Sequence, residues 1–253
     1  MDFFLGLPFF IIVAVLLPWI AGPIAVYFTN EMPALPEFFP LVDDEIESCT
    51  SPAFIERSRA MESLGFEQAA NLQWITGKSR CFTRLFYRPS TNECSQVSEI
   101  TSSVGVASGV HHYMEFITEF EDGLEIDTNN SDLSGVLAPV LQKQIHSLPG
   151  VEDAATVYKV HRYLTGDIRG QVKPLPARDR IAKMIGMESA RTLRRQVEAG
   201  YFYLDHSRGT YRPTALGAVL MSWKLVWPAG MIRKGLMRRK ASRLVRASAH
   251  LAI

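Results

Sequence analysis

The chain has 253 residues, of which 47% are hydrophobic and 21% charged, and a formal net charge of +1. This composition supplies a buried core and excludes an intrinsically disordered protein. The near-neutral total hides a net charge of −11 over residues 31–150 and of +13 over residues 151–253. An acidic body with a basic end indicates a polyanionic partner, or attraction between the two parts of the chain.

The sequence contains three cysteines, and no two of them have CxxC spacing. An odd count without metal-ligand spacing predicts neither a disulfide framework nor a zinc site. We therefore expect reduced, partly buried thiols at Cys49, Cys81 and Cys94.

Residues 1–30 contain a long apolar stretch, and the 26 positions from Phe3 to Phe28 carry no charge. As a helix they would measure about 39 Å, more than the roughly 30 Å of a bilayer core. This pattern predicts an uncleaved transmembrane anchor. A signal peptide is the first alternative, although the stretch lacks a basic start, and a buried core helix is the second.

Residues 31–50 are rich in proline and predict an extended linker that docks through Phe38 and Phe39. Residues 51–150 predict an acidic α+β domain. A helix begins after Ser51 and stops at Gly65, and an antiparallel sheet of four or five strands follows. The strand segments are "ANLQWIT", "RCFTRLFYR", "CSQVSEITSS", "HHYMEFITEFE" and "LEIDT". A further helix over residues 137–148 is expected to cover an open face of the sheet.

Chemical motifs are scarce in this domain. His111 and His112 are adjacent on a predicted strand, so at most one of them shares a face with Glu115. The acidic run from Glu119 to Asp127 is interpreted as a solvated hairpin with an Asp-Gly turn. No nucleophile elbow, P-loop, zinc-binding helix or dinucleotide fingerprint is present, and we predict no catalytic residue, no metal and no cofactor.

Residues 151–213 predict a helical region with a small hairpin. In "RTLRRQVEAGYFYLDHSRGTYRPTALGA" a helix closes at Ala199, a strand, a short wing and a return strand follow, and Thr214 caps the next helix. This stretch, about residues 187–217, resembles the helix-plus-wing end of winged-helix domains. The resemblance implies that Arg191, Arg194 and Arg195 contact nucleic acid. The alternative is a solvated or protein-binding face.

Residues 214–253 change from apolar to basic. Lys224 would cost about 2.5–3.5 kcal/mol at the centre of a second span, so a crossing over residues 214–231 is disfavoured. A basic amphipathic helix on the surface of an anionic bilayer is predicted instead. Its membrane-binding residues would be Trp223, Trp227, Arg233, Lys234, Arg238, Arg239, Lys240, Arg243 and Arg246.

These features together predict a single-pass membrane protein with its soluble domain on the cytoplasmic side. We expect a non-enzymatic accessory or scaffold protein whose α+β domain binds a ligand or a protein partner at the inner leaflet. One alternative is a membrane-associated winged-helix regulator that binds DNA. Another is an enzyme acting on lipids or envelope material, for which His112, Glu115 and Glu119 are the candidate residues.

Overall fold

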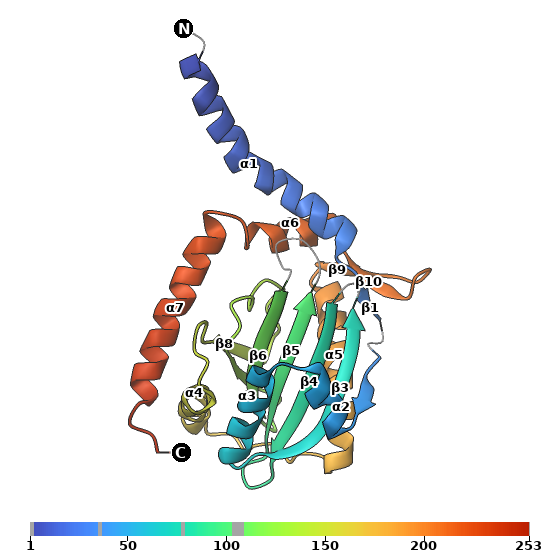
Figure 1. Cartoon of the computed structure of the whole chain (residues 1–253), viewed down its shortest axis with the longest axis vertical. Coiled ribbons are helices and arrows are strands. Elements are labelled where there is room, and N and C mark those ends of the chain that lie inside the picture. Colours follow the sequence, from blue (N-terminus) through green and yellow to red (C-terminus); the bar gives the residue numbers. More distant parts are fainter. Residues whose placement is uncertain (1–2, 35–36, 77–78, 103–108, 253) are drawn as a thin grey trace.

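The computed structural model describes the backbone of residues 3–34, 37–76, 79–102 and 109–252, with side chains from residue 16 onward except that of Thr76. The protein is α+β, with a seven-stranded sheet, a three-stranded sheet and helices around them (Figure 1). In spatial order the large sheet contains β2 (Phe39–Leu41), β3 (Glu67–Thr76), β4 (Ser79–Arg88), β5 (Glu93–Ser102), β6 (Gly109–Glu119), β7 (Glu125–Asn129) and β8 (Lys143–Ser147). The helices are α1 (Phe3–Thr29), α2 (Asp43–Cys49), α3 (Pro52–Ser63), α4 (Ala154–Gly166), the 3-10 turn η2 (Arg178–Arg180), α5 (Ile181–Glu198), α6 (Ala215–Trp223) and α7 (Ala229–Ser248).

The five strand segments expected from the sequence are confirmed as β3 to β7. The sheet is wider than the predicted four or five strands, because β2 and β8 extend its two edges. Neighbouring strands are antiparallel except β7 and β8, which are parallel. Residues 31–50 are also more structured than the predicted linker, since they contribute two short strands and α2.

The predicted helix over residues 137–148 is wrong, because this segment contains strand β8. Pro139 removes one backbone donor from any helix there, and Gln142 adopts a positive φ of 65°, which ends helical geometry. The open edge of β7 supplies the backbone partners that β8 requires.

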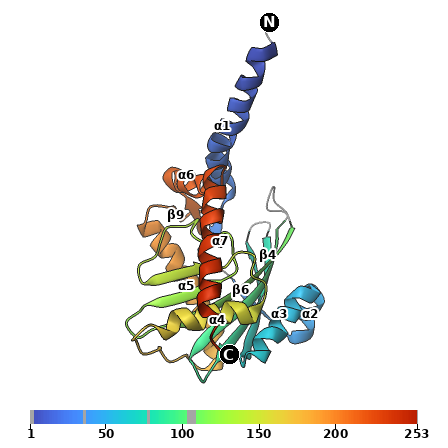
Figure 2. The same cartoon turned by 90° about the vertical axis from the view of Figure 1, so that its left-hand side faces the viewer.

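Helices cover the large sheet on both faces, and α3 and α5 lie on opposite sides of it (Figure 2). The larger core is on the α3 and α4 face, where the rings of Phe66, Phe116 and Tyr158 lie with centroids 5.1–5.5 Å apart. A smaller cluster around Leu85 and Ile181 packs α5 against the other face. The site described below lies on this second face, between the sheet and α5.

The helix-plus-wing segment is confirmed in its local structure. The helix α5 ends at its C-cap Ala199, and the Thr214 hydroxyl accepts a hydrogen bond of 2.9 Å from the Gly217 amide at the start of α6. Its surroundings differ from a winged-helix domain. The hairpin is joined by a third strand from the N-terminal segment. The preceding helix α4 does not pack with α5, because the two helices lie on opposite faces of the large sheet. The small sheet consists of β1 (Met32–Pro33), β10 (Thr210–Pro213) and β9 (Phe202–Asp205).

Among the residues that the structure describes, no helix combines the length and the apolar character needed to cross a bilayer. The side chains of residues 1–15, half of the predicted anchor, lie outside the described part. The predictions of a transmembrane anchor and of a single-pass membrane protein are therefore contradicted.

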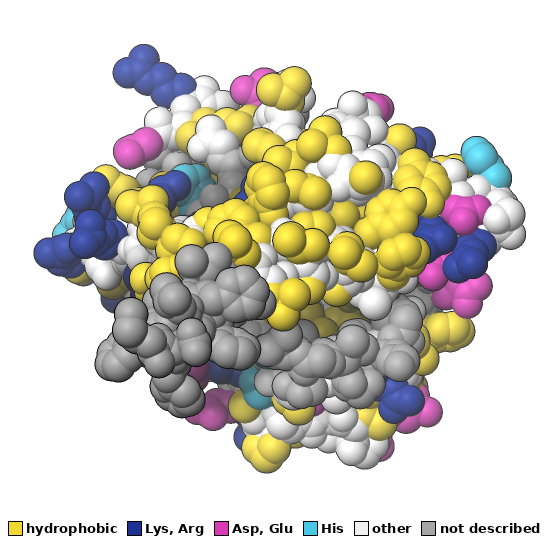
Figure 3. Space-filling view, turned by 90° about the horizontal axis from the view of Figure 1, so that it is seen from above, with side chains coloured by type: hydrophobic (Ala, Val, Ile, Leu, Met, Phe, Trp, Pro, Cys, Tyr) yellow, Lys and Arg dark blue, Asp and Glu magenta, His cyan; other side chains and the backbone are white. Residues whose placement is uncertain are grey.

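The described end of α1 packs against α6 through two tryptophans. The Trp19 indole donates a hydrogen bond of 2.9 Å to the Trp227 carbonyl, and the Trp223 indole donates one of 3.0 Å to the Trp19 carbonyl. Hydrophobic side chains gather on the face seen from above, to which α1 and α6 contribute (Figure 3). The exposed ones include Leu16, Ile20 and Leu216.

The basic C-terminal helix is confirmed as α7, which packs along α4 and β8. Ala241 and Ser248 are buried, and Leu244 and Val245 pack against the larger core. Part of the apolar face on which the membrane-surface prediction depends therefore lies inside the protein.

Candidate functional site

A pocket of about 480 Å³ lies between the large sheet and α5. Its floor is the sheet, one wall is α5 with Met184 and Ile185, and the N-terminal segment closes another side with Met32 and Phe38. The linker of residues 173–176 also lines the pocket. This volume falls within the range of about 300–1,000 Å³ that is typical of small-molecule sites.

One end of the floor, on β3, β4 and β5, is mainly apolar. Side chains alternate between the faces of a strand, so every second residue of each strand faces the pocket. Leu72, Trp74, Leu85 and Ile100 line it in this way. Trp74 also packs near Phe38, with the ring centroids 6.5 Å apart.

Two cysteine thiols belong to this apolar end. Burial raises the pKa of Cys81 to about 11 and that of Cys94 to about 12. Both thiols are therefore protonated near neutral pH and act as small apolar groups. The prediction of free, buried thiols is confirmed for Cys81 and Cys94, whereas Cys49 is free but exposed, so its expected burial is wrong.

The other end of the floor, on β6, β7 and β8, is charged. The Lys143 ammonium contacts Glu125, with which it is paired in register, and lies 2.6 Å from Oδ2 of Asp127. Burial raises the pKa of Asp127 well above its usual range, and the negative charge of Glu115 adds to this effect. Burial alone would lower the pKa of Lys143, but the neighbouring carboxylates, Asp127 above all, raise it.

Glu115 lies between the two ends and is held by neutral groups. The Gln96 amide donates to its Oε2 at 2.7 Å, and the Asn129 amide donates to its Oε1 at 3.2 Å. The side chains follow the register of the sheet, in which Gln96, Glu115 and Asn129 are directly paired. Within the described residues no Lys or Arg lies at ion-pair distance from Glu115, although the charge of the nearby Lys143 interacts with it.

Glu188 on α5 faces this charged end from the opposite wall. Its Oε2 accepts a hydrogen bond of 3.1 Å from Arg191, whereas its Oε1 is buried and has no partner among the described residues. Burial raises the pKa of Glu188, and the negative charge of Glu125 raises it further. A buried carboxylate oxygen without a donor is costly, so this atom is well suited to bind a ligand group that donates.

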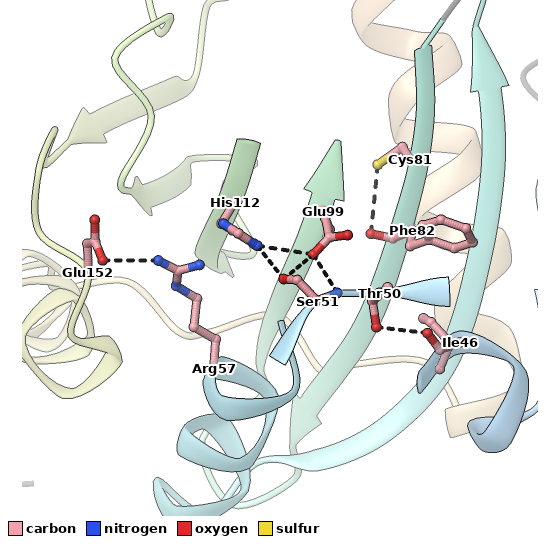
Figure 4. Close-up of polar contacts among 9 residues, drawn as sticks. All are labelled: Ile46, Thr50, Ser51, Arg57, Cys81, Phe82, Glu99, His112 and Glu152. Carbon is pink, nitrogen blue, oxygen red and sulfur yellow. Dashed lines mark hydrogen bonds and ion pairs between the residues drawn. The ribbon is translucent and has the colours of Figure 1, made fainter. Parts of the chain in front are cut away.

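The three residues proposed for an enzyme do not form one site. Glu115 and Glu119 line the pocket, whereas His112 is on the opposite face of β6, as strand alternation requires. There His112 Nε2 lies 2.8 Å from the Ser51 hydroxyl and 3.0 Å from Glu99 (Figure 4).

The Ser51, Glu99 and His112 cluster stabilises the start of α3. Glu99 accepts hydrogen bonds from the Ser51 amide at 3.0 Å and from the Ser51 hydroxyl at 2.5 Å. The serine hydroxyl and the carboxylate both contact the same imidazole nitrogen, whereas a catalytic triad places them on different nitrogens. The cluster therefore satisfies an N-terminal amide of the helix and does not have the geometry of a nucleophilic relay.

The arginines proposed for nucleic acid lie on α5 outside the pocket. Arg191 is bound to Glu188, Arg194 is exposed and Arg195 is half-buried. Their contact with nucleic acid stays a prediction.

Six of the seven C-terminal cations fall into two groups, and the seventh, Lys240, is exposed. Arg233 donates to the backbone carbonyls of Ser134 at 2.6 Å and Asp132 at 2.9 Å, and Lys234 pairs with the Asp132 carboxylate. A second group lines a shallow groove on α7 and consists of Arg238, Arg239, Arg243 and Arg246. Lipid binding by the cations and by the two tryptophans is not tested by these contacts and stays a prediction.

The acidic run from Glu119 to Asp127, interpreted as a solvated hairpin, is partly buried, since Asp127 is only 1% exposed. Sequence reasoning missed Lys143, Gln96 and Glu188 as members of a common site. A usable signal was present in "CSQVSEITSS", where polar residues occupy both faces of a strand. A strand that is covered on both sides and still carries polar side chains on each of them indicates a site on at least one face.

No protein-family model matches this chain, and no curated protein or solved structure is significantly similar to it. The pocket must therefore be interpreted from its own geometry and chemistry.

Proposed function

We propose that the protein binds an elongated small molecule in the pocket between the large sheet and α5. The observation that supports this function is a preformed cavity of about 480 Å³ that joins an apolar end to a charged end. Apolar walls with a few convergent polar groups are typical of ligand sites. Such walls favour a molecule with an apolar body and one polar end.

The direction of the pocket determines the shape of this molecule. The lining runs from Trp74 on β3 to Lys143 on β8, across five strand spacings. At about 4.8 Å per spacing this distance is roughly 24 Å. A flexible or flat apolar molecule can lie across the strands, with its polar end near β8.

Binding can be tested with the full chain and a neutral solvatochromic dye such as Nile red. Ser189 lines the pocket from α5, so Ser189→Trp would fill it. Met187 is on the same helix and 64% exposed, so Met187→Trp is the matched control. We expect Ser189→Trp to weaken dye binding at least about tenfold, equivalent to about 1.4 kcal/mol, and Met187→Trp to leave it unchanged.

Thermal melts of both variants would show that each remains folded. If folded Ser189→Trp protein bound the dye as well as the unaltered chain, the dye would be binding elsewhere and the proposal would fail. The exposed apolar face of α1 and α6 is the obvious second place for such binding, and this comparison separates the two.

A further inference from the structure

We infer that the polar end of the ligand is a protonated amine, which lies against the carboxylates at the charged end of the pocket. This inference rests on the proposed function and deepens it by naming the chemical class of the ligand.

The charges that line the pocket are unequal. Four carboxylates and two ammonium groups contribute, namely Glu115, Glu119, Glu125, Glu188, Lys143 and Lys173. Both ammonium groups are already engaged. Lys173 lies 2.6 Å from Glu119, and Lys143 is shared between Glu125 and the buried Asp127. The lining therefore carries an excess of negative charge even when Asp127 is protonated and when Arg191, which pairs with Glu188 from outside the pocket, is counted.

Two carboxylates at this end have no lysine partner among the described residues. Glu115 is held by the amides of Gln96 and Asn129, which are neutral. Glu188 has its Oε2 on Arg191, while its buried Oε1 accepts no hydrogen bond from the described residues. Both side chains line the same cavity, Glu115 from the sheet and Glu188 from α5.

A protonated amine matches both the excess of negative charge at this end and the Glu188 oxygen that lacks a donor. It supplies positive charge and up to three N–H donors, and its hydrogen bonds to carboxylates are charge-assisted. A carboxylate or phosphate on the ligand would be repelled by the excess negative charge. A neutral hydroxyl could donate to Glu188 Oε1 but would leave the charge of Glu115 without a cation at ion-pair distance.

A bare metal ion fits the same surroundings less well. The described residues contain no group of three or more His, Cys, Asp or Glu side chains placed to hold one. The amine needs only one or two acceptors, and its apolar body can occupy the β3 to β5 end of the pocket.

The experiment compares three ligands that share one dodecyl chain and differ at the polar end. Dodecylamine, dodecanol and dodecanoate would each compete with Nile red on the full chain at pH 7 and low salt, below their aggregation concentrations. At this pH the amine is protonated and the carboxylate is ionised. We expect the amine to bind at least about tenfold more tightly than the carboxylate, with the alcohol between them.

Two variants connect this preference to named residues. Glu188→Gln and Glu115→Gln should each reduce the preference for amine over carboxylate several-fold. Glu198→Gln, at an exposed position of the same helix outside the pocket, should leave it unchanged.

The outcomes separate the two proposals. Displacement by all three ligands with equal affinity, or with the carboxylate tightest, would overturn the amine inference and leave the apolar site intact. A preference for the amine that survives both pocket variants would also overturn it. Failure of every ligand to displace the dye would count against the proposed function itself.

Discussion

The Nζ atom of Lys143 lies 2.6 Å from Oδ2 of Asp127, in a pair whose side chains are 15% and 2% exposed. The two residues belong to β8 and β7, the one parallel pairing in the described sheet. Burying an ion pair costs desolvation on both partners, and the pair is tolerated when each charge keeps its partner. This contact therefore joins the added edge strand to the rest of the sheet and also shapes the charged end of the pocket.

Removal of the Lys143 charge should destabilise the protein strongly. Lys143→Met leaves the buried Asp127 and the partly buried Glu125 without a cation, and breaking a buried pair in this way costs about 3–5 kcal/mol. The free energy of unfolding from urea titrations measures the loss. Lys173→Met is the control, because the pair with Glu119 is 51% and 32% exposed and should contribute at most about 1 kcal/mol. Equal losses in the two variants would contradict this account.

Mild acid should destabilise the fold through His161. This imidazole is fully buried between the hydroxyls of Thr118 at 2.8 Å and Thr128 at 3.0 Å. Burial lowers its pKa to about 4, and the nearby charge of Arg162 opposes protonation while Glu93 favours it. The unfolded chain therefore takes up a proton between about pH 6.5 and pH 4 that the folded chain does not.

The sign of this effect follows from the lowered pKa. The stability is fully present above about pH 6.5 and is lost as the pH falls toward 4, by up to about 3 kcal/mol. Urea unfolding at a series of pH values would measure the slope, which should be shallower in His161→Gln. His111→Gln, at an exposed position, should keep the slope of the unaltered chain. A slope that is the same in all three proteins would rule out His161 as its source.

Two helical glycines should respond to alanine in opposite directions. A Cβ atom on Gly217 would lie 2.0 Å from the Tyr201 carbonyl oxygen, so Gly217→Ala should destabilise by about 1–3 kcal/mol or more. Gly235 is exposed within α7 and a Cβ there meets nothing within 4 Å. Gly235→Ala should therefore stabilise by up to about 1 kcal/mol. Melting temperatures would show the two shifts, and a stabilised Gly217→Ala would refute the close packing of α6 on Tyr201.

The cysteines should report on the pocket by their rates of reaction with a thiol reagent. Cys49 is exposed and should react first, whereas Cys81 and Cys94 are buried with raised pKa values and should react much more slowly. A ligand in the pocket should slow these two further and leave Cys49 unaffected. Mass spectrometry of the labelled peptides would follow each site, with the unfolded chain as the reference for full reactivity. Ligand protection of Cys49 alone would place the binding site elsewhere.

Several elements could be predicted from the sequence because their signals are local. Gly65, with a φ of 82°, ends α3 in a conformation that glycine adopts easily, and Thr214 caps α6 with its own hydroxyl. The alternation of side chains along β6 is enough to assign His112 and Glu115 to opposite faces of the strand. These statements depend on a residue and its near neighbours in the chain.

The sequence by itself determined the central strands, the helices α3 and α7, and the division of the chain into an acidic and a basic part. The tertiary structure decided that residues 143–147 form a strand, that Asp127 is buried, and that Glu188 meets the face of β6 that carries Glu115. Strand pairing, burial and a shared cavity depend on segments that are distant in the chain. The contacts that stabilise them form between these segments, so the secondary-structure propensity of one segment does not predict them. The pocket is such a feature, because the sheet and α5 that line it are separated along the chain by α4 and by the linker of residues 173–176.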